Sequence, residues 1–193
     1  TAAGCRPIGE ALYEAAGALG CVGMLLEMPV APTSGTEPPA AVAAAMKAAA
    51  VTLCPTSKSI THTAARRQAC AAGGRVATLP GITADCMVRC LAADYDRIAE
   101  VTHRVTALLT AGREAKLTCP HGTELILPIA GIDAIASTGL LREPGQGGNL
   151  PSGEGYLMPV EGQSEGVLFV DGSMADVAVV WAQTGELGDV RGI

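Results

Sequence analysis

The first 80 residues alternate between segments with helical spacing and short apolar runs that end near proline or glycine. This alternation constrains the fold more than any other feature of the chain. The segments with helical spacing are residues 5–19, 39–49 and 59–72, and the strand-like runs are residues 21–28, 50–54 and 75–79. Parallel strands need long crossovers, and these usually contain a helix. The pattern therefore predicts an α/β fold that begins with a Rossmann-like, three-layer half built on parallel strands.

The pattern changes after Gly81. Thr83 and Asp94 are typical helix caps, and they predict helices over 84–91 and 95–111. The later strand-like segments are 114–119 and 123–129, which form a hairpin around a Gly-containing turn, and 155–160, 166–171 and 177–181. We therefore expect a Rossmann-like domain over residues 1–82 and a β-rich α+β domain over 83–193, with one mixed domain as the alternative.

Composition excludes several classes of protein. Among 193 residues, 13 are Lys or Arg and 19 are Asp or Glu, and Arg66-Arg67 is the best basic cluster, so a nucleic-acid partner is not expected. The longest apolar run, residues 21–28, is much shorter than the roughly 20 residues that cross a membrane. The seven cysteines are odd in number and widely spaced, which favours reduced thiols and a cytoplasmic protein.

The loop after the second predicted strand is one candidate site. In open α/β sheets, ligands bind at the carboxyl ends of the strands. We expect four side chains of this loop to contact a substrate, namely Thr56, Ser57, Lys58 and His62. Free N–H groups at the start of the following helix would favour an anion or carboxylate there. A capped helix start with a solvated lysine and histidine is the alternative interpretation.

The second candidate is Glu154, a single carboxylate between two glycines and ahead of an apolar strand. Glycine lets the backbone approach a ligand or metal closely, and a carboxylate is a hard ligand for a divalent cation. A solvent-exposed loop that happens to contain a glutamate is the alternative.

Three runs extend this second candidate into a longer motif. They are Asn149-Leu-Pro-Ser-Gly-Glu154, Met158-Pro-Val-Glu-Gly162 and Gly166-Val-Leu-Phe-Val-Asp-Gly172. Together they resemble the signature of the aminopeptidase T / aminopeptidase S family, the thermophilic-type leucyl aminopeptidases. Cys54-Pro-Thr-Ser-Lys-Ser, Thr61-His-Thr63 and Thr118-Cys-Pro-His-Gly-Thr123 resemble a bacterial branch of that family. This branch is also similar to 2,5-dihydroxypyridine dioxygenase.

The resemblance implies a metallopeptidase in which a metal-activated water hydrolyses N-terminal peptide bonds of a peptide substrate. Glu154 would ligate one of two metal ions, Zn or Co, and the full-length protein would form a homodimer or another homo-oligomer. The family's remaining His, Asp and Glu ligands lack clear counterparts here, so the resemblance covers only the N-terminal portion of a family member. We therefore expect an incomplete chain, truncated at its C-terminus and inactive as a hydrolase.

Two other functions stay open. On the same scaffold, a ring-cleaving dioxygenase would hold a single Fe(II) with two histidines and one carboxylate and would act on a small molecule. The sequence has three histidines, at positions 62, 103 and 121. The other alternative is a non-enzymatic, Rossmann-like module that binds a ligand or another subunit.

Overall fold

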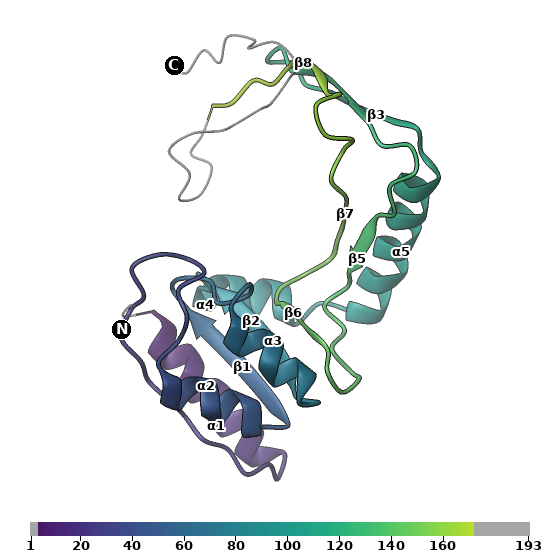
Figure 1. Ribbon diagram of the computed structural model, residues 1–193. Helices are drawn as coiled ribbons and strands as arrows, with labels where there is room; N and C mark the ends of the chain where they lie inside the picture. The colour runs from purple at the N-terminus through teal and green to yellow at the C-terminus, as the bar shows by residue number, and fades with distance from the viewer. Residues whose placement is uncertain (1–3, 172–193) are drawn as a thin grey trace. The chain divides into compact units, whose positions relative to one another are not determined.

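The computed structural model describes residues 4–171 (Figure 1). Contacts within the chain divide it into two compact units. Unit 1 comprises residues 1–99 and 139–152, and unit 2 comprises residues 100–138 and 153–193. Because a division by contacts does not test independent folding, the boundary expected near residue 82 stays a prediction.

Unit 1 is built on a three-stranded parallel sheet. Its strands are β1 (Val51–Thr56), β2 (Arg75–Pro80) and β6 (Gly147–Asn149), in the order β1-β2-β6. The register places Cys54 beside Thr78 and Thr78 beside Asn149. The carboxyl ends of all three strands therefore lie at one edge of the sheet.

Helices cover both faces of this sheet (Figure 1). On one face α2 (Ala40–Ala48) and α3 (Ala64–Ala71) pack against the strands through a cluster that includes Met46, Ala69 and Val76. On the other face α1 (Cys5–Ala18), α4 (Ala84–Cys86) and the π-helical turn η1 (Met87–Leu91) pack around Ile8 and Leu79. This confirms the predicted α/β class with a parallel sheet between helical layers.

Unit 2 combines a long helix with short antiparallel strands. Helix α5 (Tyr95–Ala111) begins in unit 1, and the Asp94 side chain accepts from the Arg97 amide at 3.0 Å, as predicted for its cap. Strands β3 (Glu114–Thr118), β4 (Glu124–Pro128) and β8 (Glu165–Val167) form one sheet, and β5 (Ile135–Ser137) pairs with β7 (Glu154–Tyr156). The predicted hairpin is therefore confirmed.

The apolar run over residues 21–28 is not a strand, contrary to the sequence prediction. Leu25 lies against Gly9 of α1, Gly23 lies against the Tyr13 ring, and most side chains of the run are exposed. The place beside β2 is taken by β6, a Gly-Gly-Asn segment that has no strand-like composition. The predicted strand 177–181 lies outside the described residues.

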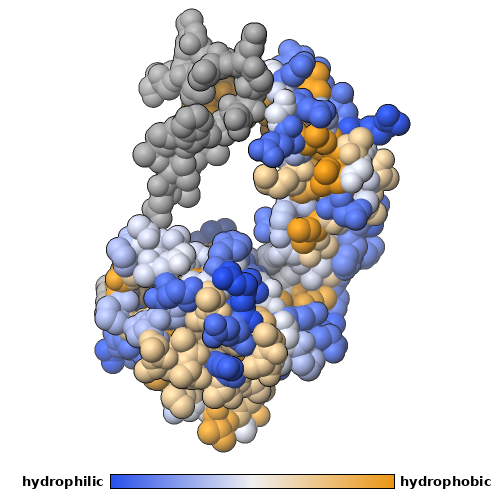
Figure 2. Space-filling model, in the orientation of Figure 1, coloured by the Kyte–Doolittle hydropathy of each residue, from blue (hydrophilic) through white to orange (hydrophobic). Residues whose placement is uncertain are grey.

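The surface of the described residues carries apolar as well as polar side chains (Figure 2). In unit 2, the large hydrophobic residues that are exposed include Val105, Leu108, Ile135 and Met158. None of the helices in residues 4–171 combines the length and the apolarity needed to cross a bilayer.

Helix α3 begins at Ala64, later than the residue 59 at which the predicted helical segment begins, because its cap is Thr63. The Thr63 hydroxyl accepts from the Arg66 amide at 3.3 Å. The Glu37 carboxylate, 27 residues earlier than Ala64, accepts from the amides of Ala64 and Ala65. These backbone N–H groups lower the pKa of Glu37.

We expect Glu37→Gln to lower the melting temperature at neutral pH, because the variant replaces a carboxylate at a helix N-terminus with a neutral amide. A depressed folded-state pKa gives stability above the unfolded pKa of about 4.3, and that stability is lost as the pH falls through the folded value. The difference between wild type and variant should therefore shrink from pH 7 to pH 3 in thermal melts. Glu14→Gln, at an exposed position on α1, is the matched control. Equal effects of the two substitutions would contradict this assignment.

Candidate functional site

A buried cluster of hydroxyl and amide groups lies at the carboxyl edge of the unit 1 sheet. Thr78 on β2 is 1% exposed and Thr61, ahead of α3, is 8% exposed. The Thr61 and Thr78 hydroxyls donate to Asn149 Oδ1 at 2.7 and 2.6 Å, and the two hydroxyl oxygens are 2.9 Å apart. Ser59 Oγ donates to Thr61 Oγ1 at 2.9 Å. Four side chains from three separate segments are thus locked into one network.

The network orients the Asn149 amide. Both threonine protons go to its oxygen, so its nitrogen carries two N–H donors. Among residues 4–171 this nitrogen has no hydrogen-bond partner, and Asn149 is only half-buried. The cluster can therefore present two fixed donors to an oxygen acceptor on a ligand.

The loop predicted to bind substrate leads into this cluster. Thr56 is the last residue of β1, and its hydroxyl donates to the Lys58 carbonyl at 2.7 Å. Ser57 and Lys58 are half-buried, whereas the His62 side chain is exposed and its carbonyl accepts from Arg67 at 2.7 Å. A role for these four side chains in substrate binding stays a prediction.

The helix start after this loop does not offer free N–H groups. The amides of Ala64 and Ala65 bind the Glu37 carboxylate, and the Arg66 amide binds the Thr63 hydroxyl. The Glu37 carboxylate thus occupies the helix start at which an anionic ligand was expected.

Cys54, which opens the loop motif, belongs to the core. It is 7% exposed and packs in the same cluster as Met46 and Val76. Burial raises the pKa of its thiol to about 12, so the thiol stays protonated and is not a nucleophile at neutral pH.

Glu154 is the first residue of β7 in unit 2, opposite Ser137 of β5, and it is exposed. Among residues 4–171 no hydrogen bond or ion pair holds its carboxylate. The next residue, Gly155, packs closely against α5, because a Cβ at this position would come within 2.8 Å of Thr106 Oγ1. The role of Glu154 as a metal ligand therefore stays a prediction.

The described residues do not fit a metal centre on their own. Within 4–171, no three His, Cys, Asp or Glu side chains come together in a group that could hold an ion. His62, His103 and His121 all belong to this range, so residues 172–193 add no imidazole. A site with two histidines and a carboxylate is absent from the described part of the chain.

The turn of the β3–β4 hairpin carries the third motif. The Thr123 hydroxyl and the backbone amides of Thr123, His121 and Gly122 lower the pKa of the exposed Cys119 thiol. The ring of His121 stacks on that of Phe169, with centroids 5.5 Å apart. These contacts give Cys119, His121 and Thr123 a structural role in the turn.

Sequence reasoning did not single out Thr61, Thr78 or Asn149 as site residues. Thr78 lies inside a strand-like run, where threonine is an ordinary strand former. Asn149 follows two glycines in a segment without any strand pattern. Only the parallel register places it beside Thr78.

Comparisons with known proteins point in one direction. The family model described as 2,5-dihydroxypyridine 5,6-dioxygenase matches residues 25–183. A solved structure of a 2,5-dihydroxypyridine dioxygenase from Pseudomonas putida KT2440 has a similar fold, with a TM-score of 0.63 and 19% sequence identity. The match covers 86% of this chain and 50% of that structure, so the chain spans about half its length. No curated protein matches the sequence.

The interpretation as an aminopeptidase is therefore wrong, and with it the expectation of a hydrolase, protease or metallopeptidase. The matched family and the matched structure are both dioxygenases. The resemblance around Glu154 rested on short, glycine-rich runs, and such runs do not determine which reaction a chain supports. The alternative with a ring-cleaving dioxygenase is the better supported one.

The hydroxyl network predicts that threonine hydroxyls inside it contribute to the free energy of unfolding, whereas a buried hydroxyl outside it does not. Thr78→Val removes the hydroxyl at constant shape and should lower the free energy of unfolding by about 1–3 kcal/mol, because it removes the hydrogen bonds of a buried hydroxyl to Asn149 and Thr61. Thr52→Val on β1 is the matched control, since Thr52 Oγ1 is buried without a hydrogen-bond partner among the described residues and its loss should be neutral or stabilising. Urea unfolding of both variants measures the difference. A Thr52→Val variant that costs as much as Thr78→Val would contradict the network.

Proposed function

This chain belongs to the 2,5-dihydroxypyridine 5,6-dioxygenase family, and we propose that it takes part in the oxidative ring opening of a hydroxylated pyridine. The observation that carries the proposal is the family match over residues 25–183. The hydroxyl and amide cluster at the carboxyl edge of the sheet supports the proposal, because it offers oriented hydrogen-bond donors to a small polar ring.

The hydrogen-bonding groups of a dihydroxypyridine match the polar side chains at the carboxyl edge of the unit 1 sheet. A dihydroxypyridine is a small flat ring with two oxygen substituents and a ring nitrogen, each of which forms hydrogen bonds. Asn149 offers two oriented donors, and Ser57 and Lys58 lie on the adjoining loop. We propose that Asn149 donates to a substrate oxygen and that loop 56–62 contacts the rest of the polar ring. Thr61 and Thr78 act as positioning residues through their bonds to Asn149.

Fe(II) is the metal that the dioxygenase interpretation implies. The described residues lack the converging ligands that would hold it, so no step of the reaction is derived through it. We propose Glu154 as one carboxylate ligand, with the remaining ligands supplied from outside this copy of residues 4–171. The proposed homo-oligomer is one source of such ligands.

The substrate proposal is tested by Asn149→Asp. This variant keeps oxygen acceptors for Thr61 and Thr78 but replaces the two N–H donors by an acceptor. We expect the affinity for 2,5-dihydroxypyridine, measured anaerobically by calorimetry, to fall by at least about tenfold. Gln68→Glu makes the same chemical change at an exposed position of α3 and should have little effect. Unchanged affinity in Asn149→Asp, or no binding by the wild type, would refute the proposal.

The metal proposal is tested by anaerobic titration with Fe(II). Glu154→Gln should weaken Fe(II) binding by at least about tenfold, because an anionic oxygen ligand becomes a neutral amide. Glu161→Gln, at an exposed position of the same unit, is the matched control. Equal Fe(II) affinities for the two variants would remove Glu154 from the metal site.

A further inference from the structure

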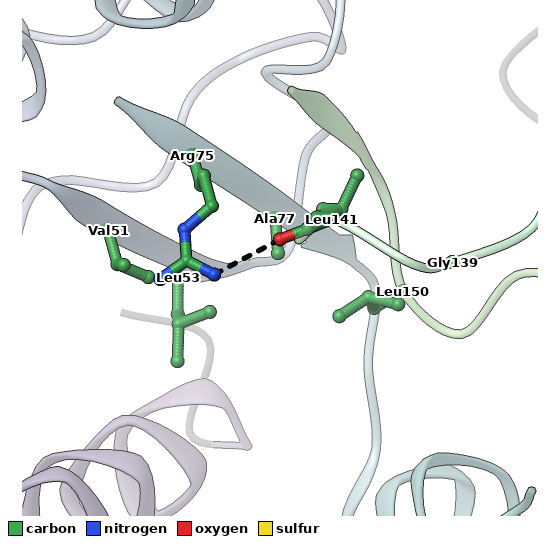
Figure 3. A pocket seen from close by; sticks show the side chains of 7 residues that line it. All are labelled: Val51, Leu53, Arg75, Ala77, Gly139, Leu141 and Leu150. Carbon is green, nitrogen blue, oxygen red and sulfur yellow. Dashed lines mark hydrogen bonds between the residues drawn. The ribbon is translucent and has the colours of Figure 1, made fainter. Parts of the chain in front are cut away.

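Unit 1 contains an open pocket of about 180 Å³, called the cavity below, on the sheet face opposite α2 and α3 (Figure 3). Its apolar lining comes from Val51, Leu53, Ala77, Leu141 and Leu150. Val51 is the first residue of β1 and Arg75, which also lines the cavity, is the first residue of β2. The cavity thus runs from the amino ends of β1 and β2 to Leu150, which directly follows Asn149 in the chain, and it lies on the sheet face opposite α2 and α3.

The Arg75 guanidinium is the one charged group in the cavity wall. It donates to the Leu141 carbonyl at 3.3 Å, and Figure 3 shows it lying across the strands between Leu53 and Leu141. Within residues 4–171 it forms no ion pair, and Arg75 is half-buried. Three arginines of the described chain have carboxylate partners, in the pairs Arg6–Glu10, Arg89–Asp85 and Arg142–Asp96. Arg66 and Arg67 donate to backbone carbonyls, as Arg75 does, but they do not line this cavity.

Within the contacts of the described residues, the Arg75 guanidinium has N–H donors that are not used. A guanidinium has five N–H donors in a planar fork that matches a carboxylate, and a single carbonyl satisfies one of them. Partial burial makes a missing counter-ion costly. The apolar walls beside it, in turn, gain from contact with a hydrocarbon group.

We propose that this cavity binds a small monocarboxylate with an apolar body, either one aromatic ring or a short aliphatic chain. The carboxylate would pair with Arg75, and the apolar body would lie against Leu53, Ala77 and Leu150. The cavity is open to solvent, and its volume of about 180 Å³ is large enough for one benzene-sized group, which fits an enclosed cavity of about 150 Å³ in another protein. This site does not depend on the proposed dioxygenase function, so the failure of one proposal would not affect the other.

The proposal is tested with benzoate as the probe, and with benzyl alcohol as a ring of similar size without the charge. In methyl NMR titrations of the full chain, benzoate should give saturable shifts at Leu53, Leu141 and Leu150. Benzyl alcohol should bind at least about tenfold more weakly, because it cannot form a charge-assisted bidentate pair. No saturable benzoate shifts at these methyl groups, or equal affinity for both compounds, would overturn the proposal.

Two variants separate the charge from the cavity. Arg75→Met keeps most of the apolar stem and should weaken benzoate binding at least about tenfold, whereas Arg104→Met, at an exposed position of α5, should not change it. Leu53→Phe fills the cavity at a position that is 42% exposed and should also lower the affinity while Arg75 remains. Thermal melts identify any variant that fails to fold. Benzoate binding that survives both Arg75→Met and Leu53→Phe would refute the site.

Discussion

The parallel pairing of β2 with β6 is the interaction on which the rest of unit 1 depends. It joins Thr78 to Asn149, which are 71 residues apart in the chain, and the Leu150 amide continues the ladder to the Thr78 carbonyl at 2.9 Å. Gly147 permits this pairing, because a Cβ there would come within 2.7 Å of Cys70 Sγ on α3. Without β6, two buried threonine hydroxyls would lose their shared acceptor, and the amide donors of Asn149 would lose their orientation.

The two ends of the parallel sheet differ in chemistry. At the carboxyl ends, the polar groups are paired with one another, and the α3 amides are satisfied by Glu37 from an earlier loop. At the amino ends, an apolar cavity holds a guanidinium that lacks a carboxylate partner among the described residues. A neutral hydrogen-bonding ligand suits the first environment, as expected for a dihydroxypyridine, and an anion with an apolar body suits the second. One small sheet thus supports two separate binding hypotheses.

Local patterns predicted most of the helices and strands correctly. Thr83 and Asp94 cap the helices that follow them, because a short polar side chain there satisfies an amide that has no partner inside the helix. The hairpin between β3 and β4 formed as expected around its Gly-containing turn. Local patterns failed where partners are distant: the apolar run over 21–28 finds no strand beside it in the described chain, and β6 pairs with β2 about 70 residues away. The resemblance to aminopeptidases failed for a related reason, since a short motif does not show which ligands converge in the folded chain.

The sequence by itself determined the α/β class, the acidic charge and most helix and strand positions, because capping, periodicity and turn chemistry act over a few residues. It also located the loop over 56–62 at a carboxyl edge, since parallel topology follows from the alternation of elements. Only the tertiary structure decided that Asn149 belongs beside Thr61 and Thr78, and that Arg75 faces an apolar cavity. Pairing across 71 residues depends on which strand occupies the sheet edge, and that choice is made by the packing of the whole unit rather than by any local run of residues.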